Sequence, residues 1–236
     1  MRGMRFALTG VLAVSMLGLA QAQFRQGGFG GGGPSGLVSN KAVQDDLKLS
    51  EEQVTKLKDW SKEFQKKSAE IRKDKGVEFG KGGGFGKIEP EMLEKMAAAN
   101  AEITKVAYKE LADVLKKEQI DRLKQIQTQQ QGTAAFTNAE VVDALKLTAA
   151  QKDSVKGIAG DLAKDTKEIF GEGAGGKGKF DFEKFQENQK KVQKLQKEYL
   201  GKMEELLDDS QKKIWKDLKG EPFDLAKLQP QPRKKD

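Results

Sequence analysis

The sequence contains neither cysteine nor histidine among its 236 residues. Without cysteine there are no disulfide bonds, thiol nucleophiles or thiolate metal ligands, and without histidine a common general base and a common zinc ligand are missing. The 36 Asp and Glu residues are spread over polar positions and form no recognisable pair for acid–base catalysis. We therefore expect no enzyme, no metal site and no cofactor.

Glycine is abundant, but its clusters do not match phosphate-binding loops. The stretches 76–87 (GVEFGKGGGFGK) and 171–179 (GEGAGGKGK) contain no GxxxxGK[ST] motif and lack the strand–turn–helix setting of GxGxxG. We interpret both stretches as loops. Any release of a bound partner is then expected to proceed without ATP.

Hydrophobic residues make up only 36% of the chain and charged residues 33%, a balance that favours amphipathic helices over a thick globule. The formal net charge of +7 is modest and interspersed. No aromatic side chains alternate with a basic stripe, as a nucleic-acid site would require. Nucleic acid is therefore not an expected partner.

Residues 1–22 have the pattern of a secretory signal peptide. Arg2 and Arg5 precede an apolar run from Phe6 to Ala20, and Ala20-Gln21-Ala22 fits a cleavage site. The alternative, an uncleaved membrane anchor, is less favoured because a bilayer span needs roughly 20 apolar residues. We expect a soluble exported protein, periplasmic or equivalent, without stable membrane insertion after cleavage. Residues 23–37 then form a glycine-rich flexible leader.

The rest of the chain contains a duplication. The segment LKLSEEQ at Leu47–Gln53 returns as LKLTAAQ at Leu145–Gln151, and residues 38–71 align with 136–169 without a gap. A weaker pair aligns residues 115–126 with 207–218. We expect an all-α protein of two tandem helical repeats, 38–132 and 133–220. A proline-rich basic tail, 221–236, follows, in which Phe223 is a candidate for docking and the end is expected to be disordered.

The repeated motif predicts the start of a helix. Ser50 is a candidate N-cap with Gln53 three residues later, the spacing of a capping box. This structural role ranks above contact with a ligand. Lys116 lacks a side-chain acceptor, so the helix from Pro90 is expected to run through it to Gly132. The candidate motif and capping residues are Leu49, Ser50, Gln53, Leu115, Gln119, Leu147, Thr148, Gln151, Leu207, Asp208 and Gln211.

Apolar residues at helical spacing predict long amphipathic helices on both sides of each glycine-rich loop. The first helix, 51–75, has a stripe that includes Trp60 and Phe64, for which a place in the core is the default. Its counterpart, 149–170, contains Gly157 and Gly160, which lower helix stability by about 1 kcal/mol each relative to alanine. The second repeat is therefore expected to be the less stable one.

Four phenylalanines lie in or beside the two loops. They are expected to anchor the loops onto the core or, less favoured, to offer exposed apolar contacts to a partner. Together with the stripe residues they make up the candidate contacts for a client protein: Trp60, Phe64, Phe79, Phe85, Phe180 and Phe182.

A signal peptide followed by paired L[ST]xxQ motifs on amphipathic helices resembles the Spy/CpxP family, whose hallmark is LTxxQ. The resemblance covers residues 38–218 as two family-like units. The motif falls on Leu49-Ser50-Gln53 and Leu147-Thr148-Gln151. It falls less closely on Leu115–Gln119 and Leu207–Gln211, where Lys116 and Asp208 replace the threonine.

Proteins of this family form thin, curved helical dimers in the periplasm, so the resemblance implies a protein of that shape and location. Because one unit per chain is typical there, the two units here imply a covalent pseudo-dimer, as a monomer or a homodimer. The implied function is an ATP-independent chaperone that binds unfolded or misfolded envelope proteins through apolar and basic surface. The alternative is an envelope-stress regulatory or structural adaptor that docks on one specific folded partner.

Overall fold

The computed structural model describes residues 33–77, 90–170 and 182–228. In these ranges every regular element is a helix and none is a strand, which confirms the prediction of an all-α protein. The predicted signal peptide, most of the leader, most of the first glycine-rich loop, all of the second and the end of the tail lie outside the described residues.

The helices of the N-terminal half are α2 (Pro34–Val38), α3 (Lys41–Asp46), α4 (Glu51–Asp74), α5 (Pro90–Leu111) and α6 (Lys117–Gln131). Those of the C-terminal half are η1 (Gly132–Thr137), α7 (Ala139–Leu145), α8 (Ala149–Phe170), α9 (Phe182–Glu205), α10 (Asp209–Lys219) and η2 (Leu225–Leu228).

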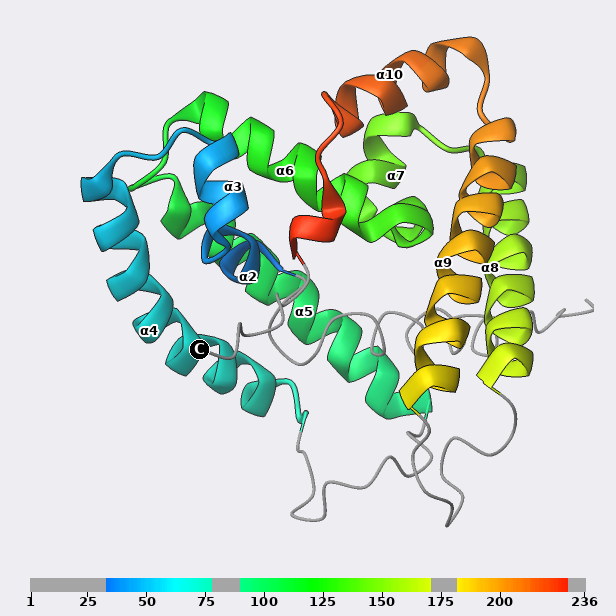
Figure 1. Ribbon diagram of the computed structural model, residues 1–236, viewed down its shortest axis with the longest axis horizontal. Helices are drawn as coiled ribbons and strands as arrows, with labels where there is room; N and C mark the ends of the chain where they lie inside the picture. The colour runs from blue at the N-terminus through cyan, green and yellow to red at the C-terminus, as the bar shows by residue number, and fades with distance from the viewer. Residues whose placement is uncertain (1–32, 78–89, 171–181, 229–236) are drawn as a thin grey trace, which may run out of the picture.

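The long helices form two pairs. Helix α4 contacts α5, and α8 contacts α9. In Figure 1 α4 lies on one side of the molecule and the α8–α9 pair on the other, α5 runs diagonally between them, and α6, α7 and α10 lie at one end.

Each half packs around its own core. One hydrophobic cluster draws its buried residues from Leu37 to Ile126, and the other draws them from Ala135 to Trp215. The chain thus passes from one core to the other between α6 and η1. The halves meet where α6 contacts α10. After α10 the chain returns to the N-terminal half, where Phe223 and Leu228 pack against its cluster, as expected for Phe223.

Helix α4 shows how local sequence fixes these elements. Leu57, Phe64 and Ser68 are its buried residues, and charged side chains occupy most of the remaining surface. The helix ends because Gly76 adopts φ +69°, a left-handed conformation that glycine tolerates. Gly76 N–H then donates to Lys73 O and Val77 N–H to Arg72 O, the two bonds of a Schellman motif.

The prediction of one helix from Pro90 to Gly132 is wrong. Helix α5 ends at Leu111 and α6 begins at Lys117. Between them Leu115 turns into the core, where it is 5% exposed. The Gln119 side chain accepts the Lys116 N–H at 2.9 Å, the half of a capping box that needs no acceptor on Lys116.

None of the helices in the described ranges has the length and apolarity that crossing a bilayer requires.

Candidate functional site

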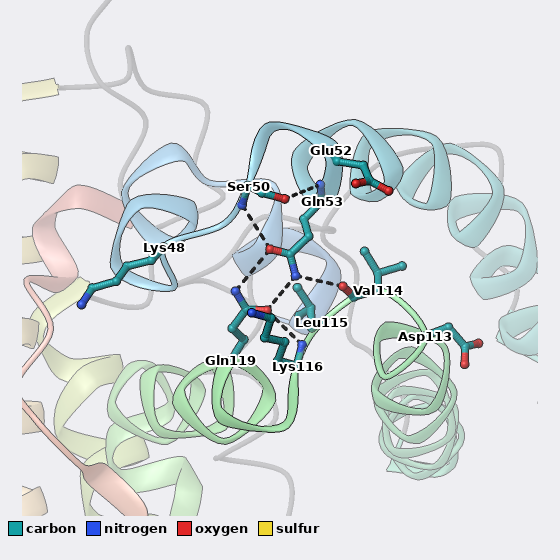
Figure 2. Close-up of a pocket in the computed structure, with 9 residues that line it drawn as sticks. All are labelled: Lys48, Ser50, Glu52, Gln53, Asp113, Val114, Leu115, Lys116 and Gln119. Carbon is teal, nitrogen blue, oxygen red and sulfur yellow. Dashed lines mark hydrogen bonds between the residues drawn. The ribbon is translucent and has the colours of Figure 1, made fainter.

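The repeated motif in the N-terminal half forms the start of α4, as predicted, and also a contact between distant segments (Figure 2). Ser50 Oγ accepts the Gln53 N–H, and Gln53 Oε1 accepts the Ser50 N–H at 3.1 Å. Gln53 Nε2 donates to Val114 O at 3.0 Å and to Gln119 Oε1 at 2.7 Å. Gln119 Nε2 in turn donates to Leu47 O at 3.1 Å. The two amides therefore connect the starts of α4 and α6.

The C-terminal half contains the same arrangement. Thr148 and Gln151 cap the start of α8 through two reciprocal bonds. Gln151 Nε2 donates to Leu206 O at 2.8 Å and to Gln211 Oε1 at 2.6 Å. Gln211 Nε2 donates to Leu145 O at 3.1 Å and to Gln151 Oε1 at 3.0 Å. We call each of these pairs, Gln53–Gln119 and Gln151–Gln211, a glutamine clasp.

The leucines of the motif support the clasps from the core side. Leu115, Leu147 and Leu207 are at most 5% exposed, and Leu49 is half-buried against the N-terminal cluster. Their burial places the amides at the edge of each core, where an unpaired polar group would be costly. The motif residues are therefore brought together for a structural purpose, as their capping pattern indicated.

Asp208 caps α10 through its carboxylate. Gln211 N–H donates to Asp208 Oδ1 at 2.8 Å, and Ser210 Oγ donates to the same oxygen at 2.7 Å. The Ser210 hydroxyl, followed by the backbone N–H of Gln211, lowers the pKa of the Asp208 carboxyl. The candidate cap at Asp208 is thus confirmed.

Two lysines that the sequence analysis did not single out adopt strained backbone conformations beside the motif. Lys48 and Lys146 both have φ +51°, in the left-handed region that residues other than glycine rarely occupy. Leu49 N–H donates to Gln44 O, and Leu147 N–H donates to Val142 O, which closes the turn after α3 and after α7. Glycine is the usual signal for such a turn, and neither position carries it.

A shallow depression of about 410 Å³ lies over the first clasp. Its wall combines lysines, carboxylates and amides, and both glutamine amides are already paired with protein groups. No group of three or more acidic side chains in the described segments is placed to hold a metal ion. Its lining residues are Lys48, Ser50, Glu52, Gln53, Asp113, Val114, Leu115, Lys116 and Gln119.

The aromatic residues of the α4 stripe belong to the core. Phe64 is 2% exposed, and the ring of Trp60 stacks on it with 4.7 Å between centroids. Trp60 is half-buried and donates its indole N–H to Glu110 Oε2 at 2.9 Å. Burial alone would raise the pKa of Glu110, but the bonds from Lys67 and Trp60 outweigh it, so the pKa is lowered. Phe64 is therefore not available as a client contact, and Trp60 is available only in part.

The structure does not describe the side chains of the other aromatic candidates for client contact. Phe79, Phe85 and Phe180 lie outside the described residues, and Phe182 is the first residue of α9, with a side chain that is not described. Among the described residues, Phe185 and Leu225 are the exposed large hydrophobic side chains, at 36% and 38%. The Phe185 and Phe170 rings lie 6.3 Å apart at the loop end of the α8–α9 pair.

Tyr199 forms a partly buried polar contact between α8 and α9. Its hydroxyl donates to Asp165 Oδ2 at 2.6 Å. This bond, together with burial, raises the pKa of Tyr199 to about 12. The hydroxyl therefore joins the two helices.

No protein-family model matches the chain, and no curated protein or solved structure does so either.

Proposed function

We propose that this chain is an exported, ATP-independent chaperone-like protein that binds unfolded or aggregation-prone envelope proteins. The observation that carries the proposal is the end of the α8–α9 pair that lies away from α6 and α10. There the α8–α9 pair presents Phe185, 36% exposed, beside Phe170. The glycine-rich sequence that joins these two helices has one further phenylalanine, Phe180, next to Lys179. Apolar groups beside positive charge suit weak contacts with many unfolded chains.

We further infer that the two halves are tandem copies of one helical unit of the Spy/CpxP kind. The glutamine clasp occurs in both halves, with the same groups bonded. The left-handed lysine before the motif also recurs. A shared ancestry accounts for both coincidences more simply than two independent origins.

The end of the described chain returns from the C-terminal half to the N-terminal half. Helix α6 ends at Gly132, φ +54°, and the following segment packs Phe136 against Trp215 in the C-terminal core, with ring centroids 4.6 Å apart. Helix α10 ends at Gly220, φ +57°, and the following segment packs Phe223 against the N-terminal core. The return of this segment to the N-terminal core, together with the contact between α6 and α10, supports a covalent pseudo-dimer.

The test is light scattering of several unrelated proteins during aggregation, each with stoichiometric mature protein (residues 23–236) and without ATP. We expect suppression for most of them. The variant Phe185→Ser should weaken suppression, whereas Gln193→Ala, an exposed change on the same helix, should not. Failure to suppress any of the proteins would contradict the proposal.

One observation favours a second candidate, an adaptor for one folded partner in an envelope-stress or structural assembly. Only Phe185 and Leu225 are exposed large hydrophobics in the described part of the chain, so most of that surface is polar and charged. Such a surface suits charge complementarity with a defined partner. An adaptor is expected to leave aggregation unchanged and to retain a single folded protein from an envelope extract in stoichiometric amount.

A further inference from the structure

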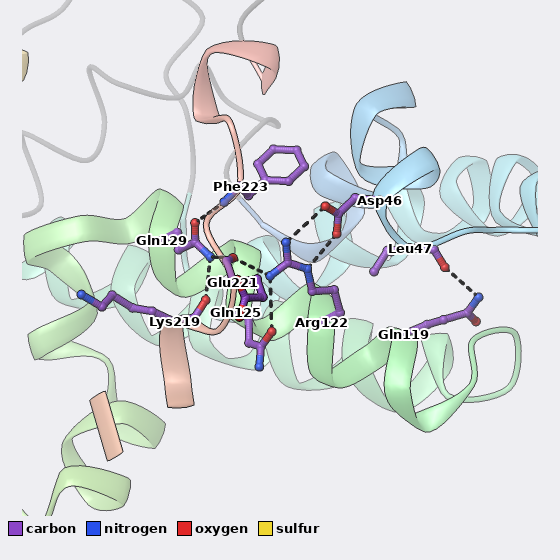
Figure 3. Close-up of polar contacts among 9 residues, drawn as sticks. All are labelled: Asp46, Leu47, Gln119, Arg122, Gln125, Gln129, Lys219, Glu221 and Phe223. Atoms are coloured by element: carbon purple, nitrogen blue, oxygen red, sulfur yellow. Dashed lines mark hydrogen bonds and ion pairs between the residues drawn. The ribbon is translucent and has the colours of Figure 1, made fainter. Parts of the chain in front are cut away.

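The segment after α10 belongs to the C-terminal half by sequence but lies on the N-terminal half (Figure 3). We call this segment, Gly220–Leu228, the strap. Residues 222–224 of the strap have no regular secondary structure, and a short turn of η2 follows. The strap is held by side chains of α6 and by the residue that caps α3.

The N-terminal half recognises the backbone of the strap. Gln129 Nε2 donates to Glu221 O at 2.8 Å, and Gln129 Oε1 accepts the Phe223 N–H at 2.8 Å. One amide thus pairs with a carbonyl and with the N–H two residues later, as a residue of a neighbouring parallel β-strand does. Arg122 Nη1 donates to Glu221 O at 2.7 Å, and Asn40 Nδ2 donates to Lys227 O at 3.1 Å.

These contacts are independent of the side chains that the strap carries, because each ends on a main-chain atom. Arg122 is held in place by Asp46, with Nε to Oδ2 at 2.7 Å and Nη2 to Oδ1 at 3.2 Å. The two side chains of this ion pair are only 18% and 27% exposed. Asp46 therefore orients the Arg122 donor that faces the strap.

Two strap side chains contribute apolar contacts. Phe223 and Leu228 are half-buried against the cluster that includes Leu123 and Ile126. Glu221 and Pro222 are exposed. Backbone bonding with apolar contacts at a few positions is the mode by which proteins bind extended peptides of varied sequence.

We propose that the surface around Asn40, Arg122 and Gln129 is a binding site for extended polypeptide, which the strap fills within the chain. An unfolded client segment with an aromatic residue at the Phe223 position takes the site when the strap leaves. Gly220, at φ +57°, is the hinge at which the strap leaves the site. The inference rests on the proposed function, because it names a client site and a built-in competitor for it. The linked strap competes at high effective concentration, so the closed chain binds clients weakly.

The experiment uses a labelled peptide of the strap sequence, GEPFDLAKL, and fluorescence anisotropy. It is titrated with the intact chain and with two opened forms, Phe223→Asp and a chain that ends at Gly220. Circular dichroism verifies that each is folded. We expect the opened forms to bind at least tenfold more tightly than the intact chain. A peptide with other residues but the same Phe and Leu positions should bind comparably.

Two changes isolate backbone recognition. Methylation of the peptide nitrogen of Phe removes the N–H that Gln129 accepts, and Gln129→Ala in an opened form removes the acceptor. Each should weaken binding at least tenfold, whereas Gln193→Ala should have no effect. Equal binding of the methylated peptide, or no binding by a folded opened form, would overturn the inference. Unfolding of both opened forms would also overturn it, because the strap would then be an inseparable part of the core.

These outcomes are distinct from failure of the proposed function. Suppression of aggregation by the intact chain without peptide binding would leave a chaperone whose clients bind elsewhere. Peptide binding without suppression would leave a peptide site in a protein that is not a chaperone.

Discussion

Replacing Gln211 with alanine should destabilise the C-terminal half by about 3 kcal/mol. The Gln211 side chain is nearly buried, at 6% exposure, and bonds with three groups: Leu145 O, Asp208 N–H and the Gln151 amide. Each lost hydrogen bond costs about 1 kcal/mol net, and more where a buried partner is left unsatisfied. Gln151→Ala removes the same amide–amide contact from the other side. The double variant should therefore be less destabilised than the sum of the two, by about 1 kcal/mol.

The two tryptophans of the chain make the assay specific to each half. Trp60 contacts the N-terminal cluster, and Trp215 lies in the C-terminal one. Urea unfolding in a Trp60→Phe background then reports the C-terminal half through Trp215 fluorescence. Gln211→Ala should lower the midpoint of that transition, whereas Gln193→Ala should leave it unchanged. If Gln211→Ala lowers the free energy of unfolding by less than about 0.5 kcal/mol, as an ordinary surface substitution does, the reasoning is refuted.

Three further predictions concern stability. Gly157→Ala and Gly160→Ala should each stabilise α8 by about 1 kcal/mol, because an added Cβ meets no atom within 4 Å, and a lower melting temperature would contradict this. Lys146→Gly should stabilise the turn before α8 by up to about 1 kcal/mol, because glycine adopts φ +51° without strain. The control Lys152→Gly, inside α8, should destabilise the helix. Urea unfolding measures both variants, and a loss of stability in Lys146→Gly would contradict the strain argument. The lowered pKa of Asp208 means that its stabilising effect is present above the unfolded-state pKa of about 3.9 and is lost as the pH falls through the folded-state value. Asp208→Asn should therefore flatten the acid limb of the stability–pH curve, and an unchanged limb would contradict this.

Much of the helical framework was predictable because it is encoded locally. Ser50, Thr148 and Asp208 each precede a glutamine at the third helical position, and all three begin helices. The core position of Phe64 also follows from its place in the apolar stripe. Capping patterns and helical periodicity depend only on neighbours in the sequence, so they can be read without the fold.

The break at Lys116 was not predictable from the same rules. A lysine offers no acceptor, and the start of α6 depends on Gln119, which is itself fixed by Gln53 far away in the sequence. The pairing of glutamines within each half and the backbone recognition of the strap by Gln129 are likewise tertiary contacts. The spacing of residues in the sequence does not predict which distant carbonyl a side-chain amide will donate to.

The central claim, that the protein selects unfolded over folded chains, is tested most directly with one client in two states. Ribonuclease A, native or reduced and carboxamidomethylated, would be titrated with the mature chain by isothermal titration calorimetry without ATP. We expect saturable binding to the unfolded form and none to the native form. Equal binding to both forms, or binding to neither, would contradict the claim.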